Sequence, residues 1–268
     1  MHAFTHHFTF EFRTGIRNKN LLLMNYLFPL SFYLMMGFIM PEINPFFRDA
    51  IVPAMVTFAV IVATLLGLPD PLVQAREAGI FRSYKINGVP ALSILLIPAL
   101  TTTLHLAVVS GLIVATAPWL FDAAVPQNWG NLLLVWLALT LACAGLGVLI
   151  GVVSPSTRMT VLLQQAIFLP SMLLGGLMMP LEMLPETAVT FARLLPATHA
   201  MNALNGLVMG FAPAFSTWSS VVVLATSGII AFVVALVLFR WDSHTPRRRG
   251  QALLLLLVLV PYLIGLLF

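Results

Sequence analysis

The sequence contains very little charge. Only 8% of its 268 residues are Asp, Glu, Lys or Arg, whereas 60% are hydrophobic; an ordinary soluble domain carries about 25% charged residues. So few charged side chains cannot cover the surface of a water-soluble particle of this size. The mean hydropathy of +1.01 agrees with this conclusion. We therefore expect a protein whose solvent is the lipid bilayer.

Cysteine and lysine are also scarce. The single cysteine, Cys143, excludes an intramolecular disulfide and any metal site built from cysteines. Lys19 and Lys85 are the only lysines, and neither follows the glycine pattern of a phosphate-binding loop. The signatures of common metalloproteases and serine hydrolases are missing as well. We therefore expect no enzymatic activity, no cofactor and no metal in this chain.

Long apolar runs fill most of the chain. Six are long enough to cross a bilayer as helices, since about 20 residues span the hydrocarbon core. They are Leu21–Met40, Ala50–Leu68, Val89–Ala117, Leu132–Val153, Met159–Met179 and Trp218–Phe239. A seventh run, Ala252–Phe268, is slightly short but uniformly apolar. The runs do not alternate in polarity as barrel strands do, so we predict an all-α integral membrane protein with six spans and a C-terminal seventh.

The basic residues predict the orientation of these spans. With a cytoplasmic N-terminus, the inner segments hold eleven Lys and Arg residues, and the outer segments hold only Arg48 and Arg193. This positive-inside bias predicts a multi-pass protein of the cell (inner, cytoplasmic) membrane. The same placement explains the pI of about 9.7 without nucleic acid as a partner. Most basic residues are therefore interpreted as topology determinants.

Three segments outside the spans have their own character. The first predicts an amphipathic interfacial helix over residues 3–17, because apolar side chains recur at every fourth position. These are Phe4, Phe8, Phe12 and Ile16. The second, Pro69–Gly88, is the longest inner loop. The third, Pro180–Pro213, is semi-apolar and broken by prolines, which favours short re-entrant helices in the outer leaflet before the sixth span.

A few polar side chains lie inside the predicted spans. Thr101, Thr102 and His105 share one face of the third span, and Gln164 and Gln165 lie in the fifth. Two interpretations stay open: they line a substrate path, or they form ordinary hydrogen bonds between helices. The second is the more common role. His105 is the only histidine in a span, and no carboxylate accompanies it, so an ion-coupled mechanism has little support.

Residues 4–242 resemble the ABC type-2 permease family, and two stretches carry the resemblance. Arg76-Glu77-Ala78-Gly79 is similar to the family's Arg-Glu-x-Gly loop between spans two and three, although Ile80 and Phe81 depart from the usual threonine and leucine. The stretch from Gly175 to His199 is similar to the family's gate signature of spaced prolines, with Leu195 and His199 in place of an asparagine and a tyrosine. Residues 251–268 lie outside the resemblance, so we divide the chain into a transmembrane domain over 1–250 and an extra hydrophobic segment.

The resemblance implies the membrane subunit of an ATP-driven exporter. A second permease chain, identical or related, would pair with this one in the lipid bilayer. Two separate ATPase subunits would bind ATP and Mg and dock on the inner loop and on the interfacial helix. The coupling residues implied are Arg76, Glu77, Gly79, Phe81, Arg82, Tyr84 and Lys85, on one short helix over 74–85 with Ile80, Phe81 and Tyr84 as apolar anchors. The outer gate implied is Pro180, Glu182, Pro185, Glu186, Pro196 and His199.

The cargo and the mechanism have competing interpretations. No ring of charges lines the spans, which favours a hydrophobic or amphipathic cargo such as a drug, antibiotic or lipid-like molecule. Export of lipid-linked polysaccharide or of sodium is the alternative within the family. An ion-coupled secondary transporter and a non-transporting membrane assembly protein are the alternatives outside it. At the outer segment, Glu182 and Glu186 would share one face of a turn near the exit, or would simply be solvated carboxylates.

Overall fold

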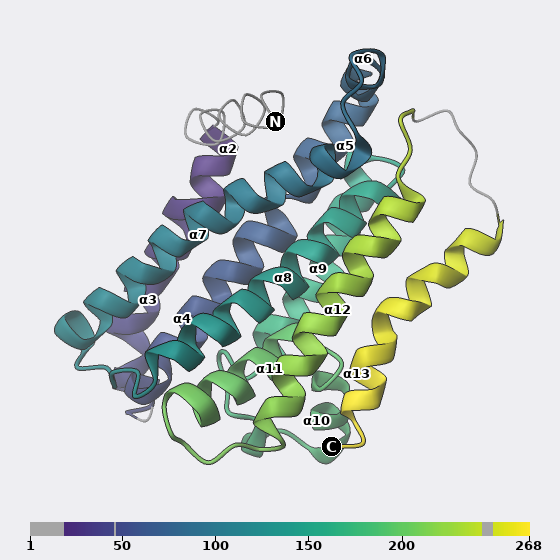
Figure 1. The fold of residues 1–268 in the computed structure, drawn as a ribbon. Helices are drawn as coiled ribbons and strands as arrows, with labels where there is room; N and C mark the ends of the chain where they lie inside the picture. Colours follow the sequence, from purple (N-terminus) through teal and green to yellow (C-terminus); the bar gives the residue numbers. More distant parts are fainter. Residues whose placement is uncertain (1–18, 46, 243–248) are drawn as a thin grey trace.

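The chain forms a bundle of helices in a computed structural model, which describes residues 19–45, 47–242 and 249–268 (Figure 1). No strand occurs within these ranges. Five helices are long and apolar enough to cross a membrane: Leu23–Ile43, Phe47–Glu77, Ala91–Phe121, Trp129–Val153 and Thr217–Leu238. They correspond to the first four predicted spans and the sixth, and they confirm an all-α, multi-pass membrane fold. The predicted interfacial helix over 3–17 lies outside the described residues.

The first two spans differ in how deeply they are buried. The first consists of α2 (Lys19–Leu22), the π-helix η1 (Leu23–Leu27) and α3 (Phe28–Ile43). Only 28% of its most apolar 18-residue stretch is buried. The second consists of α4 (Phe47–Ile61), the π-helix η2 (Val62–Leu66) and α5 (Pro69–Glu77), and 94% of the corresponding stretch is buried. A helix that is apolar on every side belongs in the centre of a bundle. The second span is that central helix.

The other long helices are α7 (Ala91–Phe121), α8 (Trp129–Val153) and α12 (Thr217–Leu238). Glycines bring α8 close to α12 and to α5. A Cβ atom on Gly228 of α12 would lie 2.6 Å from the backbone of Leu141 in α8, and one on Gly151 would lie 3.2 Å from Cα of Pro69 in α5. The spacing of Cys143, Gly147 and Gly151 predicts such a packing face, and this prediction is confirmed.

The fifth and seventh predicted spans are shorter than expected. In place of Met159–Met179, α9 covers Thr157–Leu174 and stops at Gly175. The next residue, Gly176, has a φ of +85°, which a helix does not allow. In place of Ala252–Phe268, a 3-10 helix η5 (Arg249–Leu259) leads into α13 (Val260–Gly265). Neither segment is among the five helices above. A total of six or seven spans therefore stays a prediction.

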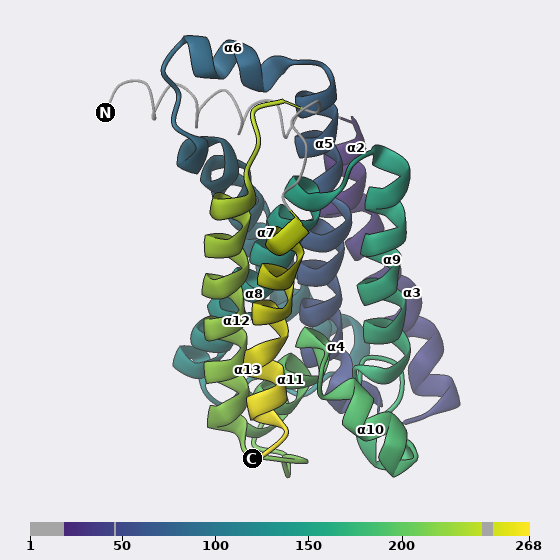
Figure 2. The same ribbon diagram turned by 90° about the vertical axis from the view of Figure 1, so that its right-hand side faces the viewer.

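The bundle has two distinct ends, which both views show (Figures 1 and 2). One end carries α5 and α6 (Ile80–Ile86), and we refer to it as the α6 end. The opposite end carries the 3-10 helix η3 (Leu181–Met183), α10 (Glu186–Ala192), α11 (Pro196–Ala203) and the π-helix η4 (Leu204–Val208). We refer to it as the α11 end. The segment of η5 and α13 runs beside α12 and finishes at this second end.

Candidate functional site

The inner loop forms a helical hairpin rather than one helix. The prediction of a single helix over 74–85 is wrong, because α5 ends at Glu77 and α6 begins only at Ile80. Gly79 lies between them with φ of +72°, a left-handed conformation that glycine adopts without strain. In the sequence, Gly79 allowed either a close approach or a turn between the two halves of the loop, and the structure shows the turn. The hairpin turns at the α6 end of the bundle.

Arg76 anchors the hairpin to α8. Its guanidinium is buried and donates hydrogen bonds to the carbonyl oxygens of Gly151 at 3.2 Å and Val152 at 2.9 Å, and also to that of Ser154. The last carbonyls of a helix lack partners within the helix, and a positive charge is favourable there. Arg76 therefore caps the C-terminus of α8. It faces the interior of this chain and offers no surface to a partner.

A second attachment joins α6 to the end of α12. The ring of Phe81 is buried, 5.4 Å from the ring of Phe239. Nε of Arg82 donates a 2.9 Å hydrogen bond to Asp242, which also accepts a bond from the terminal nitrogen of the same guanidinium. The expectation that Phe81 is an anchor for another protein is therefore wrong in this conformation. Its ring instead fills the contact between α6 and α12.

The outward surface of the hairpin is made by other residues. Glu77, Arg82 and Lys85 are exposed, and Tyr84 is half-buried. Ile80 is 43% exposed and Ile86 is 85% exposed. Ile86 was not among the predicted coupling residues; it ends α6, directly before Asn87 and Gly88. The exposed face therefore mixes both signs of charge with two apolar side chains.

The outer segment separates the two carboxylates that the sequence analysis placed together. Glu182 lies in η3 and Glu186 begins α10, with Leu184 and Pro185 extended between them. Because proline breaks the helix, the spacing of four does not put the carboxylates on one helical face. Both are exposed. The prediction of a shared face is therefore wrong, and Glu186 instead lies in the first turn of α10, where a negative charge is favourable.

His199 is at the centre of a buried hydrogen-bond network at the α11 end. Its Nε2 lies 2.8 Å from the carbonyl oxygen of Arg193, and its Nδ1 lies 3.4 Å from Oγ of Ser220 in α12. A carbonyl can only accept, so Nε2 carries the proton. Burial lowers the pKa of His199 to about 4; the hydrogen bond to Arg193 opposes this shift, and the charge of Arg193 adds to it. His199 is therefore a neutral, structural side chain near neutral pH.

Asn202 extends this network and was missed from the sequence. Its Nδ2 donates to the carbonyl of Phe215 at 3.0 Å and to Oγ of Ser220 at 3.1 Å. Its Oδ1 accepts from the backbone N–H of Ala214 at 2.9 Å. One buried amide thus fixes the loop before α12. Nothing local in the sequence separates Asn202 from Asn205, so only the packing identifies it.

The C-terminal segment is fastened to the same end. The guanidinium of Arg193 donates a 2.5 Å hydrogen bond to the carbonyl of Gly265, the last residue of α13, and its Cζ lies 4.4 Å from the centre of the Phe215 ring. Tyr262 is buried, with its hydroxyl 3.0 Å from Oγ of Ser227 in α12. Residues 251–268 therefore contribute to the bundle rather than forming a separate appendage.

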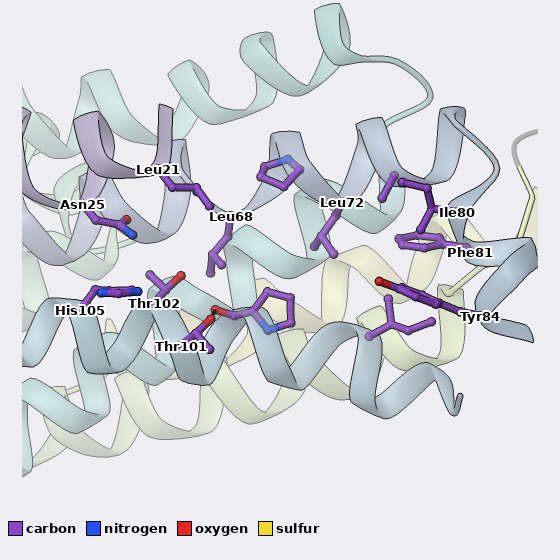
Figure 3. A pocket seen from close by; sticks show the side chains of 14 residues that line it. Leu21, Asn25, Leu68, Leu72, Ile80, Phe81, Tyr84, Thr101, Thr102 and His105 are labelled. Carbon is purple, nitrogen blue, oxygen red and sulfur yellow. Dashed lines mark hydrogen bonds between the residues drawn. The ribbon is translucent and has the colours of Figure 1, made fainter. Parts of the chain in front are cut away.

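The polar side chains predicted to line a path divide into two groups. Thr101, Thr102 and His105 are buried and line one cavity, and Figure 3 shows all three on one side of it. Gln164 lies elsewhere, where its Nε2 donates to the carbonyl of Leu66 and to Asp70, each at 3.4 Å. Gln165 is half-buried next to it. Gln164 thus joins α9 to η2 and α5, and the α7 residues border open space.

Comparison with known proteins agrees with the fold. The ABC-2 type transporter family matches residues 3–209. The chain is therefore a multi-pass membrane protein that belongs to the ABC-2 type transporter family. It is also similar to the ABC transporter G family member 20 of Dictyostelium discoideum, with 36% identity over 83 residues. That match covers 30% of this chain and 11% of the relative, so it spans only about a tenth of the relative's length.

Proposed function

We propose that this chain is the permease subunit of an ABC exporter of the cell membrane, driven by ATP hydrolysis in a separate ATPase subunit. The N-terminus and the α6 end would face the cytoplasm, and the α11 end would face outward. A second permease, identical or related, would complete the transport path within the lipid. Family membership supports the transporter assignment, and the placement of basic residues supports the orientation.

The observation that carries this proposal is the double attachment of the hairpin. Arg76 ties it to α8, and Phe81 and Arg82 tie it to the end of α12. α8 and α12 are themselves in close contact through glycines. A force applied to α6 by an ATPase would therefore reach two central helices at once. A loop that merely set topology would need basic charge but neither attachment.

The exposed face of the hairpin is the proposed docking surface. Ile80 and Ile86 would insert into the ATPase, and Glu77 and Lys85 would form charge pairs around them. Apolar anchors within a polar rim are typical of specific protein contacts. Arg76 and Phe81 would act behind this surface by transmitting the movement. The coupling role is thus divided between residues that touch the partner and residues that hold the hairpin.

Co-purification with an ABC ATPase expressed together with this chain tests the proposal. Ile86→Asp should reduce the bound ATPase severalfold, because it places a charge in an apolar contact. Ile43→Asp is the matched control, since Ile43 is 71% exposed at the opposite end of the bundle. If Ile86→Asp retains full ATPase stoichiometry and cargo-stimulated hydrolysis, the docking assignment is wrong. Transport that persists without ATP but stops when the proton gradient collapses would support the ion-coupled alternative instead.

The proposed orientation includes a crossing by the C-terminal segment. Arg247, Arg248 and Arg249 would hold its start inside, and the contacts of α13 at the α11 end would place Phe268 outside. A reporter fused after Phe268 that is active only outside the membrane should therefore be active. Activity of a cytoplasm-specific reporter at the same position would contradict the seventh span.

A further inference from the structure

A cavity near the α6 end has a polar end and an apolar end. It has a volume of about 210 Å³ and lies between η1, α5, α6 and α7. One water needs roughly 10–15 Å³ of such space, whereas drug-sized ligands occupy pockets of at least about 300 Å³. The cavity therefore has room for a small molecule or for part of a larger one.

The polar end contains an amide oxygen with no partner. Asn25 is 2% exposed, and among the described residues its Oδ1 accepts no hydrogen bond. Figure 3 shows the Asn25 amide directed into the cavity, opposite Thr102 and His105. Leaving such a group buried and unsatisfied is unfavourable, and a ligand that donates a hydrogen bond to it removes that cost. Asn25 also lies in the π-helix η1, and π-helical turns frequently mark functional sites.

The neighbouring polar groups suit a ligand that donates a hydrogen bond. The hydroxyls of Thr101 and Thr103 are occupied by carbonyls of their own helix. Thr102 instead lines the cavity, as does His105, whose Nδ1 lies 2.7 Å from the hydroxyl of Tyr26. None of the described lining residues is Asp, Glu, Lys or Arg. A desolvated ion would have no counter-charge here, so a neutral donor such as a hydroxyl fits best.

The direction of the polarity excludes an ordinary phospholipid. The lining residues Leu72, Phe81 and Tyr84 lie toward the α6 end, where the Tyr84 hydroxyl is an uncharged polar group, and His105 lies deeper in the bundle. From Ile94 to His105 the rise of α7 is about 16 Å, at about 1.5 Å per residue. A phospholipid of the adjacent leaflet would have its head group at the bundle end and its tails deep. The cavity needs the reverse arrangement, with the polar group innermost.

We infer that this cavity binds a neutral, apolar molecule with a hydroxyl group, an aliphatic alcohol or a phenol, whose hydroxyl donates to Oδ1 of Asn25. The apolar body of the molecule lies along Leu68, Leu72 and Phe81. This inference rests on the proposed export function for its meaning, since it names the class of cargo. The binding itself requires only the permease.

Photolabelling of the full chain in lipid nanodiscs tests the inference. The probe is a medium-chain alkanol that carries a diazirine, and its methyl ether is the non-donating control. We expect saturable labelling of α5 and α7 at residues that line the cavity. Asn25→Leu should weaken it roughly three- to tenfold, the value of one hydrogen bond. The original protein should bind the ether more weakly than the alcohol, by the same factor. The Asn25→Leu variant should bind the alcohol and the ether equally well.

A second variant guards against a folding defect. Thr102→Val preserves shape and should also weaken the labelling, whereas Thr103→Val on the other side of α7 should leave it unchanged. Equal labelling by alcohol and ether, unchanged labelling of Asn25→Leu, or a cavity that holds only water would overturn the inference. Saturable binding without ATP-driven export would leave it standing and contradict the proposed function. Export that persists in Asn25→Leu with unchanged affinity for the alkanol would contradict the inference alone.

Discussion

The two ends of the bundle both use an arginine to hold a helix terminus, but they treat their surroundings differently. At the α6 end, Arg76 caps α8 and the hairpin around it leaves Glu77, Lys85 and Ile86 exposed. At the α11 end, Arg193 holds Gly265, and its neighbours His199 and Asn202 are buried with their partners. The first end therefore leaves charged and apolar side chains of the hairpin exposed. The second buries the polar groups of His199 and Asn202 in hydrogen bonds within the chain, although Glu182 and Glu186 at the same end are exposed.

The α6 end has the features of a coupling region, and the α11 end has those of a region that opens or closes. The α6 end has rigid internal attachments beneath an exposed face, which suits a part that receives a force. The α11 end joins α11 to α12 through hydrogen bonds of neutral groups and holds the C-terminal segment with the charged guanidinium of Arg193, which suits a part that must stay sealed or open as a unit. Arginine serves both ends because its planar group can donate several hydrogen bonds, as Arg76 does, or can donate one and lie over an aromatic ring, as Arg193 does.

The largest effect is expected from Arg76. Arg76→Met should lower the free energy of unfolding in detergent by about 3 kcal/mol, since charged hydrogen bonds to otherwise unpaired carbonyls are lost. Arg82→Met is the comparison within the same hairpin, and it should cost less than about 1 kcal/mol because its ion pair is exposed. Equal losses for the two variants would mean that the buried cap does not dominate this end.

Acid should weaken the α11 end. The pKa of His199 is lowered to about 4 in the fold from an ordinary value of 6.5, so folding favours the neutral ring. Its stabilisation is complete above pH 6.5 and declines as the pH falls toward 4. Between pH 6.5 and 5 the loss should be on the order of 2 kcal/mol. Denaturation at several pH values should show this slope, and it should disappear in His199→Gln; an unchanged slope would assign it to other groups.

A smaller, local effect is expected from Arg193. Arg193→Met removes the cap on α13 and the cation above the Phe215 ring, which together contribute about 1–2 kcal/mol. Hydrogen exchange should accelerate in residues 253–268, while the hairpin over 69–86 keeps its protection. Acceleration at both ends would show that the two ends are energetically linked rather than separate.

The smallest effect is expected from the outer carboxylates. Glu182→Gln together with Glu186→Gln should leave ATP-driven export within twofold of the original rate, because both side chains are exposed and lie on separate elements. A large fall in the export rate, with assembly intact, would restore these residues to the outer gate.

The sequence by itself determined the class of protein and the positions of most spans. Apolar runs of about 20 residues have few alternatives to membrane helices, since every backbone polar group must be satisfied within lipid. The glycine spacing in α8 predicted its packing face, because small residues on one side of a helix let another helix approach closely. At Gly79 the sequence allowed a close approach or a turn, and the structure shows a turn in the left-handed conformation that favours glycine.

Only the tertiary structure decided which way the side chains of the loops face. Arg76, Phe81 and Arg82 lie within seven residues, yet one caps α8, one packs on Phe239 and one pairs with Asp242. Those partners are distant in sequence, so spacing could not reveal them. The same holds for Asn25, which nothing in its local sequence marks as a site residue. Its place in η1 directs it into a cavity that α5, α6 and α7 also line. Periodicity reports the environment of a helix face, whereas a site depends on contacts that folding alone creates.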